Sequence, residues 1–239
     1  MSNLRWQIAQ WFELRWWQRY LSGKDKFQYY AWKKQYWNDL LTQIGEKLPY
    51  RDAGSVADVG CGPAGIFIAF EDKKVIAADP LLDTYEKTLP FFHKQDFPYT
   101  TFINQKLEDF EPIPKSPKGN FNSQSTDVLK PPLGGLGVEK FDIVFCMNAI
   151  NHVADIDLAY DRLVAATKDN GYVVVSIDAH NHSFFKNLFR LIPGDILHPH
   201  QYDLEEYADF MTKRGCKILK KQLVKKEFFF SHYVLVGRK

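Results

Sequence analysis

The chain has 239 residues and a mass of 27.9 kDa, which suits one globular domain with a modest appendage. Hydrophobic residues make up 45% and charged residues 25%, which argues against a wholly disordered chain and against a protein of many membrane spans. The 31 basic and 29 acidic residues leave a formal charge of +2, too little to favour nucleic acid as the partner.

The first 50 residues concentrate the aromatic side chains. All six tryptophans lie in the first 37 residues, and apolar positions recur at helical spacing over 3–21 and 26–48, with Asp25 as a possible cap between them. We predict an aromatic-rich helical unit over 1–50, followed by a second domain over 51–239. Three interpretations of the first unit stay open: a cap over a cleft, helices that only pack on a sheet edge, or weak attachment to a membrane surface, since tryptophan mixes with Lys and Arg.

From residue 56 the pattern changes to short apolar runs separated by helix-length stretches. Continuous apolar strands of this kind are typical of a parallel sheet covered on both faces. A helix over 204–214 and two further β-rich runs predict an antiparallel hairpin at the end. The predicted fold is α/β, a Rossmann-like doubly wound sheet of about seven strands, and the predicted strands are 56–59, 75–78, 101–104, 141–147, 172–177, 216–223 and 228–237.

One segment interrupts the alternation. Residues 111–139 hold five prolines, four glycines and mostly polar side chains, too little apolar material for a packed element. We predict a disordered loop insertion, with an active-site lid as the alternative.

A glycine turn follows the first predicted strand and is expected to open a helix. Gly60, Gly62 and Gly65 match the pattern G-x-G-x-x-G, which by itself fits a nicotinamide or flavin dinucleotide. Asp79 ends the next strand, where a carboxylate can accept both hydroxyls of a ribose. Asp58, just before the glycines, would repel a diphosphate and suits a ligand that carries positive charge.

These residues resemble the class I S-adenosylmethionine-dependent methyltransferases. Residues 58–65 look like the first motif of that family, Asp79 like its ribose-binding acid, 141–153 like its fourth motif, and 169–175 like the turn and strand that come next. The resemblance covers 51–239 and implies S-adenosylmethionine as cofactor. Carried over position by position, it implies a cofactor site made of Asp58, Gly60, Cys61, Gly62, Gly65, Asp79, Pro80, Leu107, Glu108 and Asn148.

Within that resemblance, Gly60 to Gly62 would pass along the methionine part, Asn148 would lie near its end, and Leu107 and Glu108 near adenine. The chain departs from the family at Lys106, where an acidic residue often contacts the adenine amine. That contact would fall to Glu108 or Asp109.

Histidines are the candidate bases for removing a proton from an alcohol, phenol or amine acceptor. Our order of preference is His152, His198 and His180, all in segments after the fourth and fifth predicted strands. Two His-x-His pairs with Asp178 could also form a zinc or iron site. We expect no metal, because the three cysteines, Cys61, Cys146 and Cys216, lie far apart and no compact ligand motif is present.

The predicted function is therefore methyl transfer to a small molecule, at oxygen or nitrogen rather than carbon. A NAD(P)-dependent oxidoreductase and a non-catalytic nucleotide-binding module are the alternatives. We expect no nucleic-acid partner and no stable membrane insertion, and the unpaired cysteines and charged N-terminus favour the cytoplasm. Substitution of Trp32 or Trp37 is expected to impair use of the acceptor and to spare cofactor affinity.

Overall fold

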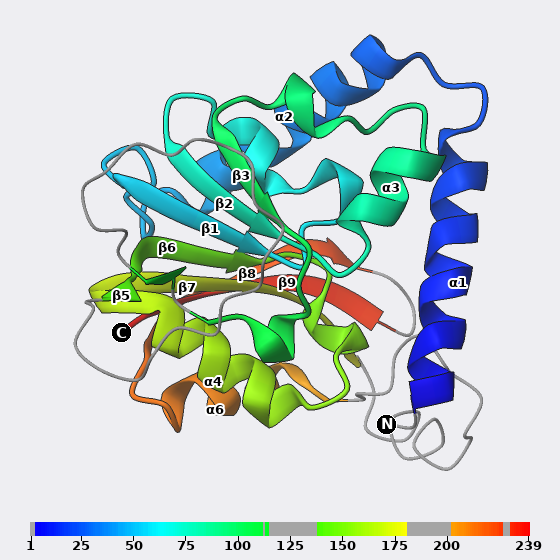
Figure 1. Cartoon of the computed structure of the whole chain (residues 1–239). Helices are drawn as coiled ribbons and strands as arrows, with labels where there is room; N and C mark the ends of the chain where they lie inside the picture. The colour runs from blue at the N-terminus through cyan, green and yellow to red at the C-terminus, as the bar shows by residue number, and fades with distance from the viewer. Residues whose placement is uncertain (1–2, 112, 115–137, 181–201, 227–229) are drawn as a thin grey trace.

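A seven-stranded sheet forms the centre of the protein. The computed structural model describes residues 3–111, 113–114, 138–180, 202–226 and 230–239 (Figure 1). The sheet order is β3-β2-β1-β6-β7-β9-β8. Its strands are β1 Ser55–Val59, β2 Lys74–Ala78, β3 Thr100–Ile103, β6 Phe141–Cys146, β7 Thr167–His180, β8 Lys217–Lys226 and β9 Phe230–Arg238.

The five strands β1, β2, β3, β6 and β7 are parallel, and β9 joins β7 and β8 in antiparallel pairs. This confirms the predicted α/β sheet with its antiparallel end. The chain builds outward from β1 to β3 and then returns to place β6 on the other side of β1. The carboxyl ends of β1 and β6 therefore form the topological switch point, where open α/β sheets bind ligands.

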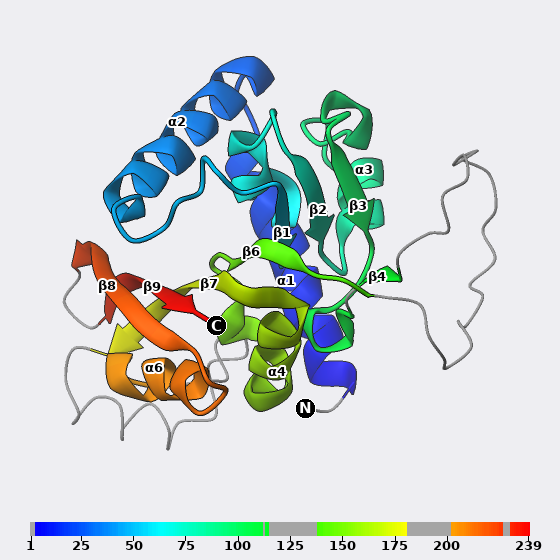
Figure 2. The same cartoon turned by 90° about the vertical axis from the view of Figure 1, so that its left-hand side faces the viewer.

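Both faces of the sheet are covered, which explains the continuous apolar strands. Ile143 and Phe145 of β6 point into one core, and Val144 and Cys146 into the other. The first face carries α2 Lys26–Ile44 and α3 Leu82–Thr88, and the second carries α4 Ile156–Ala166 and α6 Leu204–Thr212 (Figure 2). Among the described residues, one further α-helix, α1 Asn3–Leu21, stands across the carboxyl ends of the parallel strands (Figure 1).

Helix α2 belongs to the core of the sheet. Its Trp37, Leu41 and Ile44 are buried in the same cluster as strand residues, and the Asp25 carboxylate caps the helix by accepting a hydrogen bond from the Gln28 amide at 2.9 Å. The division between an N-terminal unit and a second domain at residue 50 stays a prediction. Helix α2, which precedes that boundary, packs in the same core as the strands that follow it.

The prediction of a helix directly after the glycine turn is wrong. Two short 3-10 turns stand there instead, η1 Gly62–Ala64 and η2 Ile66–Ala69. The physical reason is that α2 already covers this face of the sheet. The buried side chains of Ile66 and Phe67 fill the narrow space between α2 and the strands.

Other differences concern element bounds. The strand predicted over 172–177 runs from Thr167 to His180, because β9 pairs with it as far as Phe230. The two ends of the predicted insertion pair as β4 Ile113–Pro114 and β5 Val138–Glu139. Residues 112 and 115–137 of that insertion lie outside the described residues, as does the link 227–229 of the hairpin.

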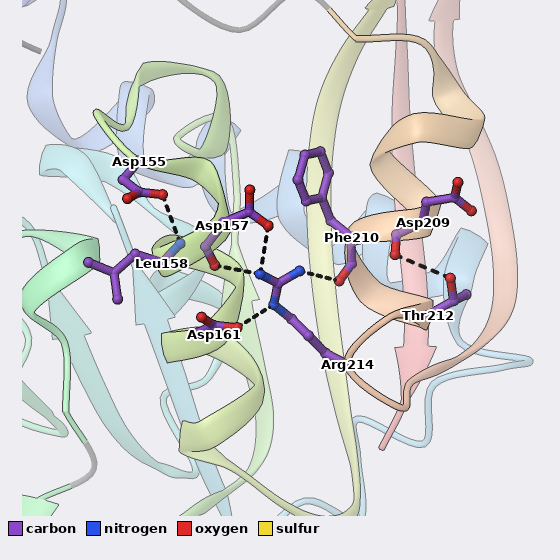
Figure 3. A network of polar contacts seen from close by, with 8 residues as sticks. All are labelled: Asp155, Asp157, Leu158, Asp161, Asp209, Phe210, Thr212 and Arg214. Atoms are coloured by element: carbon purple, nitrogen blue, oxygen red, sulfur yellow. Dashed lines mark hydrogen bonds and ion pairs between the residues drawn. The ribbon is translucent and has the colours of Figure 1, made fainter.

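One arginine ties the two helices of the second face together. Figure 3 shows Arg214, just past the end of α6, reaching Asp161 through Nε at 2.5 Å and Asp157 through Nη2 at 2.9 Å, both on α4. Its Nη1 also donates to the Phe210 carbonyl at 2.8 Å. The arginine side chain is 14% exposed, so its several charge-assisted hydrogen bonds are partly shielded from water.

We predict that Arg214→Ala lowers the free energy of unfolding by about 1–2 kcal/mol, because it removes shielded hydrogen bonds whose aspartate partners stay largely hydrated. Urea unfolding followed by circular dichroism measures the effect. Lys213→Ala changes a neighbouring exposed cation and is the control. Equal loss in both variants would contradict a role for the arginine fork.

Candidate functional site

A cavity of about 490 Å³ lies at the switch point of the sheet. Its floor comes from the segments after β1, β2 and β6, and residues of α1 and α2 form its walls. Of the cofactor residues predicted from the sequence, nine line it: Gly60, Cys61, Gly62, Gly65, Asp79, Pro80, Leu107, Glu108 and Asn148. The tenth, Asp58, does not.

The glycine turn needs glycine for two reasons. Gly60 and Gly62 have φ of +75° and +56°, which L side chains rarely adopt. A Cβ at Gly60 would also lie 2.3 Å from the Cβ of Ala149, in the loop after β6. The turn after β1 and the loop after β6 therefore touch, and together they form the floor of the cavity.

The Asp79 carboxylate fastens the glycine turn to the end of β2. It accepts hydrogen bonds from the amides of Gly62 at 3.0 Å and Leu81 at 2.8 Å. Burial, and then the nearby carboxylate of Glu13, raise the pKa of Asp79 to about 7. Each oxygen accepts one of these bonds, so each retains acceptor capacity towards the cavity.

Asp58 lies behind the floor. It is fully buried, and its Oδ2 accepts a hydrogen bond from the Phe67 amide at 3.0 Å, at the start of η2. Its Oδ1 accepts no hydrogen bond from any described residue. Burial raises the pKa of Asp58 to about 7, and the positive charge of Lys33 opposes that rise.

Lys33 brings a positive charge from α2 to the wall of the cavity. Its ammonium lies 4.5 Å from the ring centre of Trp37 and 4.6 Å from that of Tyr36, distances at which a cation is attracted to an aromatic face. Burial lowers the pKa of Lys33 to about 8, and Asp58 counteracts this. The ammonium forms no hydrogen bond to the described residues, so its donors are available.

Glu13 brings a negative charge from α1 to the same cavity. Its Oε1 accepts a hydrogen bond from the Tyr85 hydroxyl at 2.7 Å, which ties α1 to α3. Sequence reasoning missed both Glu13 and Lys33. For Glu13 the available signal was its position as the only acidic residue of an aromatic and basic helix; for Lys33 it was the spacing of four to Trp37.

Glu108 and Asn148 are held by hydrogen bonds to neighbouring segments. Glu108 lines the cavity while its Oε1 accepts a hydrogen bond from the Ala154 amide at 2.6 Å, next to the start of α4. Asn148 has φ of +55°, and its amide donates to the Ser176 hydroxyl of β7 at 2.5 Å. Lys106 also lines the cavity.

The histidine predictions have different outcomes. His152 is exposed at the cavity, in the turn η5 Ile150–His152, and its neighbour Asn151 anchors this turn by accepting a hydrogen bond from the buried Tyr207 hydroxyl at 2.8 Å. His198 and the side chain of His180 lie outside what the structure describes. No group of three or more potential metal ligands occurs among the described side chains.

The aromatic side chains of α1 and α2 differ in their position relative to the cavity. Phe12, Trp16 and Trp17 line the cavity, and Trp32 lies outside it. Trp37 lines the cavity but is only 2% exposed, and its Nε1 donates to the Ala64 carbonyl at 3.2 Å. Trp37 thus supports the glycine turn as well as the cavity wall, and the effect of substituting Trp32 or Trp37 on use of the acceptor stays a prediction.

Comparisons with known proteins identify the family and the fold of the chain. A family described as a methyltransferase domain matches residues 28–221. No curated protein sequence matches the chain.

Several solved structures share the fold. Magnesium protoporphyrin IX methyltransferase from Synechocystis PCC 6803, solved with S-adenosylmethionine, is 13% identical, with a TM-score of 0.57 over 100% of this chain and 98% of that one. The 1,6-didemethyltoxoflavin-N1-methyltransferase of Burkholderia thailandensis, solved with its substrate and S-adenosylhomocysteine, is 14% identical, with a TM-score of 0.58 over 100% and 91%. The N-methyltransferase NodS of Bradyrhizobium japonicum is 10% identical, with a TM-score of 0.54 over 87% of this chain and 96% of that one. At such identities the likeness concerns the fold, whereas the match over 28–221 concerns the sequence, and by that match the chain belongs to the family of methyltransferase domains.

Proposed function

We propose that this methyltransferase uses S-adenosylmethionine to methylate a small molecule at oxygen or nitrogen. The observation that carries the proposal is the meeting of the glycine turn, Asp79 and Asn148 in one cavity at the switch point. Structural neighbours solved with S-adenosylmethionine or S-adenosylhomocysteine support this cofactor, and the porphyrin and toxoflavin enzymes support a small acceptor.

The charges around the cavity fit the cofactor. Asp79 has acceptor capacity for ribose hydroxyls, and Gly60 and Gly62 line the cavity beside it without side chains. Lys33 stands beside this turn with available donors, so we assign it to the carboxylate of the methionine part. Leu107 would pack on adenine, with Glu108 as the polar partner of the adenine amine.

The chain contributes alignment and proton removal to the reaction. S-adenosylmethionine supplies a methyl group on a sulfonium, and transfer requires the acceptor in line with the breaking bond. Phe12 and Trp16 of α1 offer aromatic faces that would hold a flat or apolar acceptor. His152, at the same cavity, would take the proton that an oxygen or nitrogen acceptor loses.

The cofactor is tested by thermal shift with S-adenosylhomocysteine and with NAD. We expect stabilisation by S-adenosylhomocysteine alone, and a much smaller shift in Asp79→Asn, which loses the charge that binds ribose. Asp72→Asn, an exposed change distant from the cavity, should keep the full shift. Stabilisation by NAD alone would instead favour the oxidoreductase alternative.

Catalysis is tested with S-adenosylmethionine labelled in its methyl group and cell extract as the source of acceptor. We expect label in a small-molecule fraction and a loss of roughly 10²-fold or more in rate for His152→Ala, since general bases contribute on that scale. Binding of S-adenosylhomocysteine should persist in this variant. His93→Ala, outside the cavity, is the control, and unchanged transfer in His152→Ala would remove the histidine from the mechanism.

The role of Lys33 is tested with two ligands that differ at the methionine end. We predict that Lys33→Met weakens S-adenosylhomocysteine roughly tenfold or more and leaves 5′-methylthioadenosine, which has no carboxylate, unchanged. Lys34→Met is the matched control, because that lysine pairs with Glu71 at 2.5 Å on the surface. Calorimetry measures both affinities.

The same pair of ligands gives a pH signature. Because burial lowers the pKa of Lys33 to about 8, the affinity of wild type for S-adenosylhomocysteine should fall as the pH rises through 8. Lys33→Met should lack this dependence on the charge of the lysine. Equal weakening of both ligands by Lys33→Met would mean that the lysine only supports the cavity wall.

A further inference from the structure

We propose that the outer face of α1 docks on an anionic membrane surface, with the helix lying in the plane of the lipid headgroups. The outer face is defined as Ile8, Trp11, Phe12, Arg15, Trp16 and Arg19. These residues recur at spacings of three and four, so they form one stripe along the helix.

The two sides of α1 differ in what they contact. Glu13 and Trp17 point into the cavity, and Leu14 packs against the core, so the inner side is covered. The outer face is exposed throughout: Trp11, Phe12 and Trp16 are 53%, 47% and 54% exposed. The helix therefore carries aromatic side chains on both sides but is packed on only one.

The outer face of α1 leaves large aromatic side chains exposed to solvent. Contiguous exposed aromatic side chains mark sites of interaction. In this stripe the rings of Trp11 and Phe12 meet at 5.0 Å between centres, and Trp16 follows Phe12 by one helical turn. Its three large aromatic residues make a surface rather than a single exposed side chain.

The positive charge of the outer face favours an anionic binding partner. Arg15 and Arg19 are its ionisable residues, and the guanidinium of Arg15 lies 5.1 Å from the ring centre of Trp11. The only acidic residue of α1, Glu13, faces the other way and bonds Tyr85. Tryptophan combined with arginine on one face of a helix suits a lipid interface that carries negative charge.

A second copy of the chain fits this face less well. In a two-fold dimer the same patch meets itself, so the arginines of both copies would approach each other without an acidic partner from the outer face. Attachment would be peripheral, because no helix among the described residues is long and apolar enough to span a bilayer. Phe12 and Trp16 border both this face and the cavity, so docking would bring the cavity mouth to the lipid.

Vesicle binding tests the proposal, with tryptophan emission as a local reporter because all six tryptophans precede residue 38. We expect full-length protein to bind phosphatidylcholine vesicles that contain phosphatidylserine, with a blue shift, and to bind pure phosphatidylcholine vesicles much more weakly. Reversing the charges in R15E/R19E should weaken binding roughly tenfold or more. Trp11→Ser should weaken it several-fold and reduce the blue shift.

Controls separate docking from misfolding. Leu223→Ser removes an exposed apolar residue on β8, away from α1, and should bind vesicles as wild type does. Melting temperature and the thermal shift with S-adenosylhomocysteine should be retained in Trp11→Ser and R15E/R19E, whose residues do not line the cavity.

Three results would overturn the proposal: no binding to either vesicle, equal binding to both, or a concentration-dependent dimer by light scattering that Trp11→Ser dissociates. The last result would assign the face to a second copy. A failure of membrane docking is distinguishable from a failure of the proposed cofactor, because the thermal shift with S-adenosylhomocysteine is measured separately in the same variants.

Discussion

The hydrogen bonds that the Asp79 carboxylate accepts from Gly62 and Leu81 hold the site together. They join the turn after β1 to the end of β2, while the lack of a side chain at Gly60 lets that turn touch the loop after β6. Three strand ends therefore converge on one cavity. A carboxylate can maintain these bonds and still accept others, so the group that organises the turn is also suited to hold the ribose of a ligand.

The short η1 and η2 turns change how the first face of the sheet is built. Helix α2 occupies the space over these turns, and its Tyr30 and Trp37 donate hydrogen bonds to the carbonyls of Pro63 and Ala64. The same helix places Lys33 near the buried Asp58. Because burial disfavours both charges, it lowers the pKa of Lys33 and raises that of Asp58, and their mutual attraction opposes both shifts. The aromatic and basic composition of α2 thus serves the core and the cavity together.

Helix α1 separates two environments. Its inner side supplies Glu13 and aromatic walls to the cavity, and its outer face presents aromatic and arginine side chains to the surroundings. The edge strand β8 shows the contrasting case, since its row of lysines keeps an unpaired strand edge hydrated. Of the exposed large apolar residues that the structure describes, Phe12 and Trp16 lie at the cavity, whereas Phe27 and Trp32 lie outside it.

Local sequence was sufficient to predict the layered sheet, because buried parallel strands must be continuously apolar and must be joined by crossover segments. It was also sufficient for the glycine turn and the place of Asp79, since both are local features that come directly after a strand. Most of the predicted cofactor residues line the cavity for this reason. The exact partners of the motif residues were not encoded locally: Asp58 faces η2, and Trp37 supports the turn, as a consequence of where α2 packs.

The residues that reach the site from outside the motifs became known from the folded chain alone. Glu13 and Lys33 are distant in sequence from Gly60 and Asp79, and no periodicity relates these positions. A helix was predicted directly after the glycine turn, where η1 and η2 stand. That prediction was wrong because the local sequence pattern does not report that α2 covers the same face of the sheet. Each segment's sequence thus limits what that segment can become, whereas the approach of α1 and α2 to the switch point depends on packing between distant segments.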